Sequence, residues 1–258
     1  MLELFDYELA SCPTKVRLTL AEKGITWNRR RTDILKFEHK SSRFLEINPA
    51  GLLPVVLLDD GTSLTESHII IQYFDASHNG PSLTPKDPLA RAKMQFWLKR
   101  IDDIHLAQGL WNYDQVFLPY WRNVPVDAMD SLLKRFDSAT AAERMRHLFK
   151  HGIPREKLAD AHQSLMQFFY RVERQLEQSL WLCGDQYTLA DIALTPYVNT
   201  VVHAVSNIWH NKLINITRWL RQVRERPSYQ TAIASYPLDP KLIDAILAAP
   251  QGGGWPEL

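Results

Sequence analysis

The residues of this chain with the clearest capacity for chemistry are Ser11 and Cys12, which stand directly before Pro13. Proline suits the first turn of a helix, so the sequence predicts that a helix begins here, with Ser11 or Cys12 at its cap. Such an end is electropositive, and a hydroxyl or thiol adds a hydrogen-bond donor. The segment is therefore suited to stabilise an anionic sulfur. In the alternative, Ser11 is an ordinary cap and Cys12 a small buried residue.

The first ~80 residues are predicted to follow the order β-α-β-α-β-β-α. A turn at Asp59-Asp60-Gly61 indicates a β-hairpin. Pro54 stands at the head of its first strand, where it marks a strand start, an edge or a special peptide geometry. Thr65 to Ser67 are expected to cap a helix. The side chains of that helix predicted to face inward are Ile69, Ile70, Tyr73 and Phe74.

A linker is predicted between residues 77 and 88, which hold three prolines and Gly80. It divides the chain into a domain at residues 1–80 and a domain at residues 88–258. Strand signals largely stop in the second domain, which is predicted to be helical, with 112–154 as its least regular part. Thr188 and Asp191 have the spacing of a capping box, and we expect them to start a buried helix.

Composition excludes several classes of function. The chain has 258 residues, 45% of them hydrophobic, and its 30 basic and 29 acidic residues leave a charge of +1. It therefore offers no general attraction for nucleic acid or anionic lipid. No apolar stretch reaches the ~20 residues of a membrane span. Two cysteines far apart in sequence suit a reducing compartment, so we expect a cytoplasmic protein. His147 and His151 have no third ligand nearby, so no metal is expected.

Five motifs in order resemble the cytosolic glutathione transferases. They are Ser11 to Leu18 with Glu22-Lys-Gly24, Phe44 to Pro49, Leu53-Pro54, Thr65-Glu-Ser67 and Thr188 to Ala193. The resemblance implies an α/β thioredoxin-like N-terminal domain that holds glutathione and an all-α C-terminal domain that holds a second substrate. The stretch from Gly152 to Leu158 most resembles the bacterial β-etherase-like branch, whose members cleave lignin-type aryl ethers.

The resemblance also implies a glutathione site. Ser11 or Cys12 would be the catalytic residue. Ser11 as a donor to the glutathione sulfur suits a transferase, whereas Cys12 as a nucleophile suits thiol reduction. Pro54 resembles the family's cis-proline, which leaves the Leu53 backbone free to pair with the tripeptide. Glu66 and Ser67 would hold its γ-glutamyl end. The full set of expected glutathione contacts is Ser11, Cys12, Pro13, His39, Leu53, Pro54, Glu66 and Ser67.

His39 would contact the glycine carboxylate of glutathione, and Lys36 or Lys40 could take its place. In the alternative, His39 is a surface histidine with no part in binding. Aromatic residues near position 115 would contact the second substrate, since aromatic side chains stack on aromatic ligands. The alternative for each is packing between helices. Tyr113 and Tyr120 also carry a phenol that can donate to a leaving group. The expected lining residues are Trp111, Tyr113, Phe117 and Tyr120, with Trp121 and Trp209 as further candidates.

These inferences predict a glutathione-dependent transferase whose thiolate attacks a hydrophobic aromatic electrophile. The β-etherase-like branch adds β-aryl ether cleavage as a narrower hypothesis. Two alternatives stay open: a Cys12-based, glutathione-dependent thiol reductase, and a non-catalytic binding module of the same fold. The expected partners are glutathione, a small aromatic substrate and a second copy of the chain.

Overall fold

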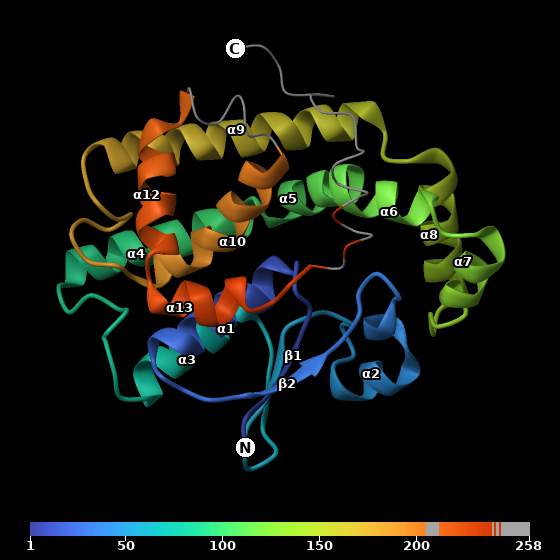
Figure 1. Cartoon of the computed structure of the whole chain (residues 1–258), viewed down its shortest axis with the longest axis horizontal. Coiled ribbons are helices and arrows are strands. Elements are labelled where there is room, and N and C mark those ends of the chain that lie inside the picture. The colour runs from blue at the N-terminus through green and yellow to red at the C-terminus, as the bar shows by residue number, and fades with distance from the viewer. Residues whose placement is uncertain (205–211, 239, 241–242, 244–258) are drawn as a thin grey trace.

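The computed structural model describes residues 1–204, 212–238, 240 and 243. Figure 1 shows an N-terminal part with a sheet and its helices, and a larger part whose described elements are helices joined by turns. This is the predicted fold class, an α/β thioredoxin-like domain joined to an all-α domain. We propose that the boundary between the domains lies in the connection that runs from Ser77, the end of α3, to Pro88, the start of α4.

The sheet has four strands in the order β2-β1-β3-β4. Strand β1 is parallel to β2 and antiparallel to β3, and β3 is antiparallel to β4. The hairpin predicted around Gly61 is therefore present. Its first strand follows directly after Pro54, as expected for a residue that cannot donate to the ladder. The strands are β1 Glu3–Asp6, β2 Asn28–Arg31, β3 Val55–Leu57 and β4 Ser63–Leu64.

Helix α1 (Ser11–Glu22) packs between the sheet domain and the helical domain. It contacts α3 (Ser67–Ser77), α10 (Leu189–Ala204) and α13 (Pro227–Tyr229). The predicted cap at Ser11 or Cys12 is wrong. The cap is Ala10, whose carbonyl oxygen accepts from Thr14 N at 3.1 Å, with no side-chain cap bond. Ser11 and Cys12 are thus the first two helical residues, and their backbone N–H groups have no partner within the helix. The helix ends at Glu22, with Lys23 as its C-cap. Gly24 follows with a φ of 66°, a backbone conformation that only glycine adopts at little energetic cost.

The cap of α3 (Ser67–Ser77) lies within the predicted segment, Thr65 to Ser67. Its cap is Glu66, in a backbone conformation with φ of 65°, and no side chain makes a capping hydrogen bond. Ile70 and Phe74 are buried as predicted. Ile69 and Tyr73 instead lie on the outer face, 59% and 37% exposed. The helix therefore buries a narrower stripe than its apolar composition suggests.

The second domain is built from helices, including the region 112–154, which is regular rather than irregular. Helix α10 lies at its centre, against α1, α4 and α12. None of the helices in the described part of the chain has the length and apolar character needed to cross a membrane. The elements are α4 Pro88–Asp103, α5 His105–Asn112, the π-helical turn Tyr113–Phe117, α6 Leu118–Arg122, α7 Val126–Leu133, α8 Ala139–His151, α9 Arg155–Glu177, α10 Leu189–Ala204, α12 Ile214–Arg224, α13 Pro227–Tyr229 and the π-helical turn Gln230–Ala234.

The predicted capping box starts α10. Thr188 Oγ1 accepts from Ala190 N at 3.3 Å, and Asp191 Oδ2 accepts from Thr188 N at 3.0 Å. Asp191 Oδ1 also accepts from Trp219 Nε1 at 3.0 Å, so the box holds α12 as well. Both box residues are fully buried. Their role is therefore to position the helix that carries Tyr197 toward α1.

Candidate active site

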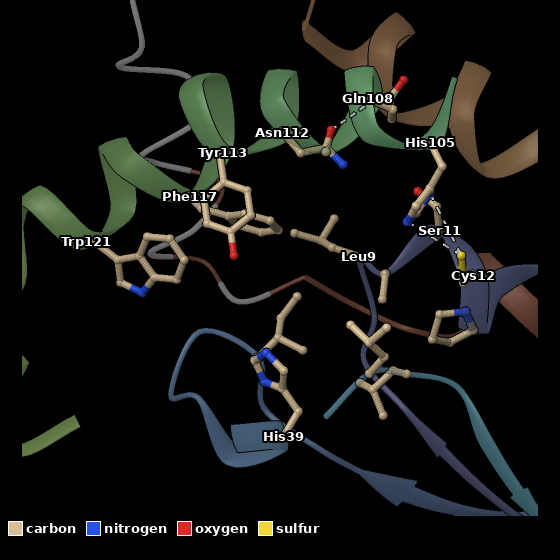
Figure 2. A pocket seen from close by; sticks show the side chains of 16 residues that line it. Leu9, Ser11, Cys12, His39, His105, Gln108, Asn112, Tyr113, Phe117 and Trp121 are labelled. Atoms are coloured by element: carbon tan, nitrogen blue, oxygen red, sulfur yellow. Dashed lines mark hydrogen bonds between the residues drawn. The ribbon is translucent and has the colours of Figure 1, made fainter. Parts of the chain in front are cut away.

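A cavity lies between the first turn of α1 and the segment that runs from α5 to α6 (Figure 2). The sheet domain contributes one wall with Ser11, Cys12 and Pro13, and the helical domain contributes the opposite wall. Each domain alone leaves the cavity open on one side. The fold thus places the electropositive end of α1 directly opposite a helical wall.

Cys12 is half-buried at the bottom of this cavity, where its sulfur contacts His105 on α5. The Sγ atom lies 3.9 Å from Nδ1 and 4.0 Å from Nε2 of that ring (Figure 2). Burial disfavours the thiolate, but the charge of Lys15 and the contact with His105 outweigh it. Together they lower the pKa of the Cys12 thiol to about 7. About half of a thiol with that pKa is ionised at neutral pH.

Five polar residues form a network that begins beside Cys12. Lys15 is fully buried, and its Nζ lies 3.1 Å from Nε2 of His68. His68 Nδ1 in turn lies 2.8 Å from Asp102 Oδ2. His105 Nδ1 lies 2.8 Å from the Tyr197 hydroxyl on α10. Sequence reasoning assigns no role to any of these five residues, because they come from five different helices and only Lys15 lies within one of the motifs identified above.

The other residues expected to contact the tripeptide fall into two groups. Leu53 lies on the cavity wall, and the peptide bond that joins it to Pro54 is cis. Glu66 and Ser67 are not among the cavity's lining residues. Ser67 is buried, and its hydroxyl helps to lower the pKa of the Cys12 thiol. The start of α3 therefore adjoins the start of α1 beside the cavity.

His39 lies on the cavity wall and is neutral at physiological pH (Figure 2). Burial and the neighbouring charge of Lys40 lower the pKa of its ring to about 3. Its Nδ1 atom is buried and has no hydrogen-bond partner among the described residues. Lys40 is engaged, since its Nζ donates to the carbonyl oxygen of Gly51 at 2.7 Å. Any carboxylate at this wall would thus meet a neutral imidazole, without a full positive charge on the ring.

The helical wall is aromatic, but its members differ from those predicted. Tyr113, Phe117 and Trp121 line the cavity, with centroid separations of 5.4 to 5.7 Å between their rings (Figure 2). Trp111 is only 1% exposed in the core, and neither it nor Tyr120 is among the lining residues. The spacing of four residues accounts for the observed set, because it places side chains on one helical face. Trp209 lies outside the described residues.

Nearer to Cys12, the helical wall of the cavity is polar, not aromatic (Figure 2). Gln108 and Asn112 line the cavity, and Gln108 Nε2 donates to Asn112 Oδ1 at 2.9 Å. The described residues contain no group of three or more His, Cys, Asp or Glu placed to hold a metal ion. The rings of His147 and His151 are tilted against each other with their centroids 4.4 Å apart, and neither residue lines the cavity. Both cysteines are free thiols.

Comparison with protein families matches both parts of the chain. Residues 10–77 match the family model "Glutathione S-transferase, N-terminal domain", and residues 140–227 match "Glutathione S-transferase, C-terminal domain". The two matches lie in the same order as the two structural domains and together cover more than half of the sequence.

Relatives of known sequence or structure agree with this assignment. The chain is 27% identical over 247 residues to Protein LigF of Sphingobium sp. (strain NBRC 103272 / SYK-6), which covers 88% of this chain and 91% of LigF. It is 27% identical over 228 residues to Glutathione S-transferase 2 of Saccharomyces cerevisiae, covering 87% and 86% of the two chains. The crystal structure of the β-etherase LigF shares the fold, with a TM-score of 0.77, 24% identity and coverage of 91% and 99%. A glutathione transferase homologue from Sulfitobacter, solved with bound glutathione, shares the fold at a TM-score of 0.66 and 20% identity, covering 91% and 96%.

Proposed function

Because the chain belongs to the glutathione S-transferase family, we propose that it activates the thiol of glutathione for attack on a hydrophobic aromatic electrophile. One observation carries this proposal. A single cavity has the first turn of α1, with Ser11 and Cys12, on one side and the rings of Tyr113, Phe117 and Trp121 on the other. An anionic sulfur and an apolar aromatic ligand would each find a suitable wall there.

The sheet domain would bind and ionise glutathione. A free thiol of pKa ~8.5 is only a few per cent ionised at neutral pH, and each unit of depression is worth ~1.4 kcal/mol of thiolate stabilisation. Ser11 is suited to donate to the sulfur, because it is the first residue of α1 and lies on the cavity wall. The backbone of Leu53 and the side chain of His39, both on the same wall, would contact the rest of the tripeptide. Pro13 would close the wall beside Ser11, and Pro54 would hold the Leu53 segment.

Glu66 and Ser67 would hold the γ-glutamyl end of glutathione. Ser67 begins α3, and a helix N-terminus favours a carboxylate. Glu66 would accept from the γ-glutamyl ammonium group. The contact of Ser67 with Cys12 supports this assignment, because it brings the start of α3 next to the sulfur site.

The helical domain would hold the electrophile. The glutathione sulfur would form a bond to carbon while the bond from that carbon to the leaving group breaks. Tyr113 would donate a proton to the departing oxygen, since its phenol lies on the cavity wall and burial raises its pKa. The likeness to LigF supports a benzylic ketone with an aryl ether at the neighbouring carbon as the substrate class, and a phenol as the product.

A second candidate is favoured by Cys12. Its thiol contacts His105 and has a pKa of about 7, as a nucleophile requires. In a reductase, the Cys12 thiolate would attack a disulfide between glutathione and a second thiol. It would form a mixed disulfide with glutathione and release the other thiol. A second glutathione thiolate would then release oxidised glutathione and restore Cys12.

We also propose a homodimer in the cytoplasm. Exposed apolar side chains occur on two neighbouring helices of different domains, Ile69 and Tyr73 on α3 and Leu89 and Phe96 on α4. A second copy of the chain would cover such side chains. Two free cysteines suit the reducing cytoplasm. Light scattering after size-exclusion chromatography tests the dimer, and a monomer at micromolar concentration contradicts it.

An activity screen separates the two enzymes. Wild type, Ser11→Ala and Cys12→Ala are assayed with glutathione against aryl ethers, a chloro-nitro arene and hydroxyethyl disulfide. A transferase reacts with the first two classes, and Cys12→Ala keeps that activity while Ser11→Ala loses most of it. A reductase acts on the disulfide and loses that activity in Cys12→Ala. Failure to bind a glutathione column, or binding without thiolate absorbance, supports a non-catalytic module instead.

A further inference from the structure

Cys12 sits at the end of a chain of polar side chains that continues away from the cavity. Cys12 and Lys15 are three residues apart on α1 and therefore lie on the same face of that helix. Behind Lys15 come His68 on α3 and Asp102 on α4, at 3.1 Å and 2.8 Å. Lys15 also lies under the Tyr197 ring, 5.0 Å from its centroid. The proposed chemistry of glutathione and electrophile assigns no task to Lys15, His68 or Asp102.

A buried lysine needs a compensating partner, because burial penalises the ammonium. Lys15 is fully buried, and no carboxylate among the described residues lies within ion-pair distance of it. Burial lowers its pKa, while the Cys12 thiolate and Asp102 act in the opposite direction. The ammonium of Lys15 and the thiolate of Cys12 therefore support each other. Loss of either charge removes the main partner of the other.

His68 is suited to hold this ammonium, provided that its ring is neutral. Burial and the charge of Lys15 lower the pKa of His68 to about 4. A neutral ring has one N–H and one acceptor nitrogen. Asp102 can only accept, so it keeps the proton on Nδ1 and leaves the Nε2 lone pair free for Lys15. Asp102 thus acts on the lysine through the tautomer of the histidine between them.

We propose that Lys15, oriented by His68 and Asp102, is the positioning residue that keeps Cys12 ionised at neutral pH, with His105 taking up the thiol proton. The contact with the sulfur raises the pKa of His105, so a thiolate–imidazolium pair forms as the proton crosses from Sγ to the ring. The Tyr197 hydroxyl fixes that ring at 2.8 Å and remains protonated, since burial raises its own pKa. The Ser67 hydroxyl on α3 also helps to lower the pKa of the Cys12 thiol.

This inference deepens the assignment of Cys12 as a nucleophile and rests on it, but its test needs no substrate. The sequence contains two cysteines, so Cys183→Ser leaves Cys12 as the only thiol. Cys183 is a suitable position for that change, because burial raises its pKa to about 12. Ultraviolet thiolate absorbance and the rate of alkylation by iodoacetamide, both followed against pH, then report Cys12 alone.

In this background we expect a Cys12 midpoint near pH 7. Lys15→Met keeps the length of the side chain and removes its charge. The midpoint should rise by about one pH unit or more, since an opposite charge nearby shifts a pKa by ~1–3 units. Asp102→Asn should raise it by a smaller amount. Lys157→Met removes an exposed lysine on α9 and should change nothing.

A Lys15→Met midpoint equal to that of Lys157→Met overturns the proposal. If Lys15→Met fails to fold by circular dichroism, Asp102→Asn decides, because the Asp102 side chain is 55% exposed and tolerates replacement. An unchanged midpoint in Asp102→Asn then overturns it. Calorimetric titration with glutathione on the same proteins is a separate measurement. Absence of glutathione binding contradicts the proposed function and leaves the thiol titration unaffected.

Discussion

Trp121 Nε1 donates a hydrogen bond of 3.0 Å to the carbonyl oxygen of Leu35, and this bond joins the helical domain to the sheet domain. The same indole stacks on Phe37 with ring centroids 5.2 Å apart and also lines the cavity. One residue of α6 is therefore both a wall of the proposed substrate site and a link between domains. A change at this position should affect stability and co-substrate binding together, whereas glutathione binding should change little.

Trp121→Phe tests that double role. The shorter ring cannot donate to Leu35, whose carbonyl is left without this donor, and we expect the free energy of unfolding to fall by about 1–3 kcal/mol. The KM for an aromatic co-substrate should rise severalfold because part of the wall is lost. Urea unfolding and steady-state kinetics measure the two effects. Trp181→Phe, in a half-buried tryptophan away from the cavity, should cost stability alone. An unchanged KM in Trp121→Phe would contradict the role of the wall.

Tyr113→Phe tests the proton donor. The substitution keeps the ring that lines the cavity and removes its hydroxyl. For a poor leaving group such as an alkoxyphenol, general acid catalysis contributes typically 10²–10⁴-fold, and we expect kcat to fall by about 10²-fold with KM for glutathione unchanged. For a chloride leaving group, which needs no proton, kcat should be nearly unaffected. Tyr120→Phe is the matched control, because Tyr120 neighbours Trp121 in sequence but does not line the cavity. Equal losses for both leaving groups would rule out the acid role.

The sequence was most informative where local chemistry determines the structure. The helix after Ser11, the hairpin at Gly61 and the capping box at Thr188 each depend on neighbouring residues and are present. The cap at Ala10 was missed because backbone geometry, not side-chain preference, decides where that helix begins. The apolar character of Ile69 predicts burial in the core of its own chain, but the side chain lies on the outer face of α3.

The candidate site was predictable in part for the same reason. Ser11 and Cys12 could be found from the helix start, but Lys15, His68 and His105 could not. Their importance arises only when three helices pack against each other, and the separations in sequence carry no signal of that packing. The aromatic wall is an intermediate case. Tyr113, Phe117 and Trp121 repeat every four residues, so a helical period would have separated them from Trp111.

His39→Gln should reduce the sensitivity of the fold to acid. The folded-state pKa of His39 is about 3, below the ordinary 6.5, so the unfolded chain takes up this proton first as pH falls. Stability from this group is therefore present above about pH 6.5 and decreases toward pH 3. Between pH 7 and pH 5, wild type should lose about 1–2 kcal/mol more than His39→Gln, by urea unfolding at each pH. His147→Gln, at an exposed histidine, should lose as much as wild type. Equal losses in all three proteins would contradict the prediction.

Asp191→Ala should be among the most damaging single substitutions outside the cavity. The carboxylate accepts from the backbone N–H groups of Leu182 and Thr188 and from Trp219 Nε1, all buried. Alanine leaves these donors without their acceptor, at ~1–3 kcal/mol for each unsatisfied group, and we expect a loss of at least ~3 kcal/mol. Denaturant unfolding measures the loss, and Asp185→Ala at a neighbouring exposed carboxylate should cost less than ~0.5 kcal/mol.

Because burial raises the pKa of Asp191 to about 6, above the ordinary 3.8, the folded state binds this proton more tightly. The contribution of Asp191 therefore becomes more favourable as pH falls from 6 toward 4. The difference in stability between wild type and Asp191→Ala should widen over that interval, and a difference that stays constant or narrows would contradict the raised pKa of Asp191.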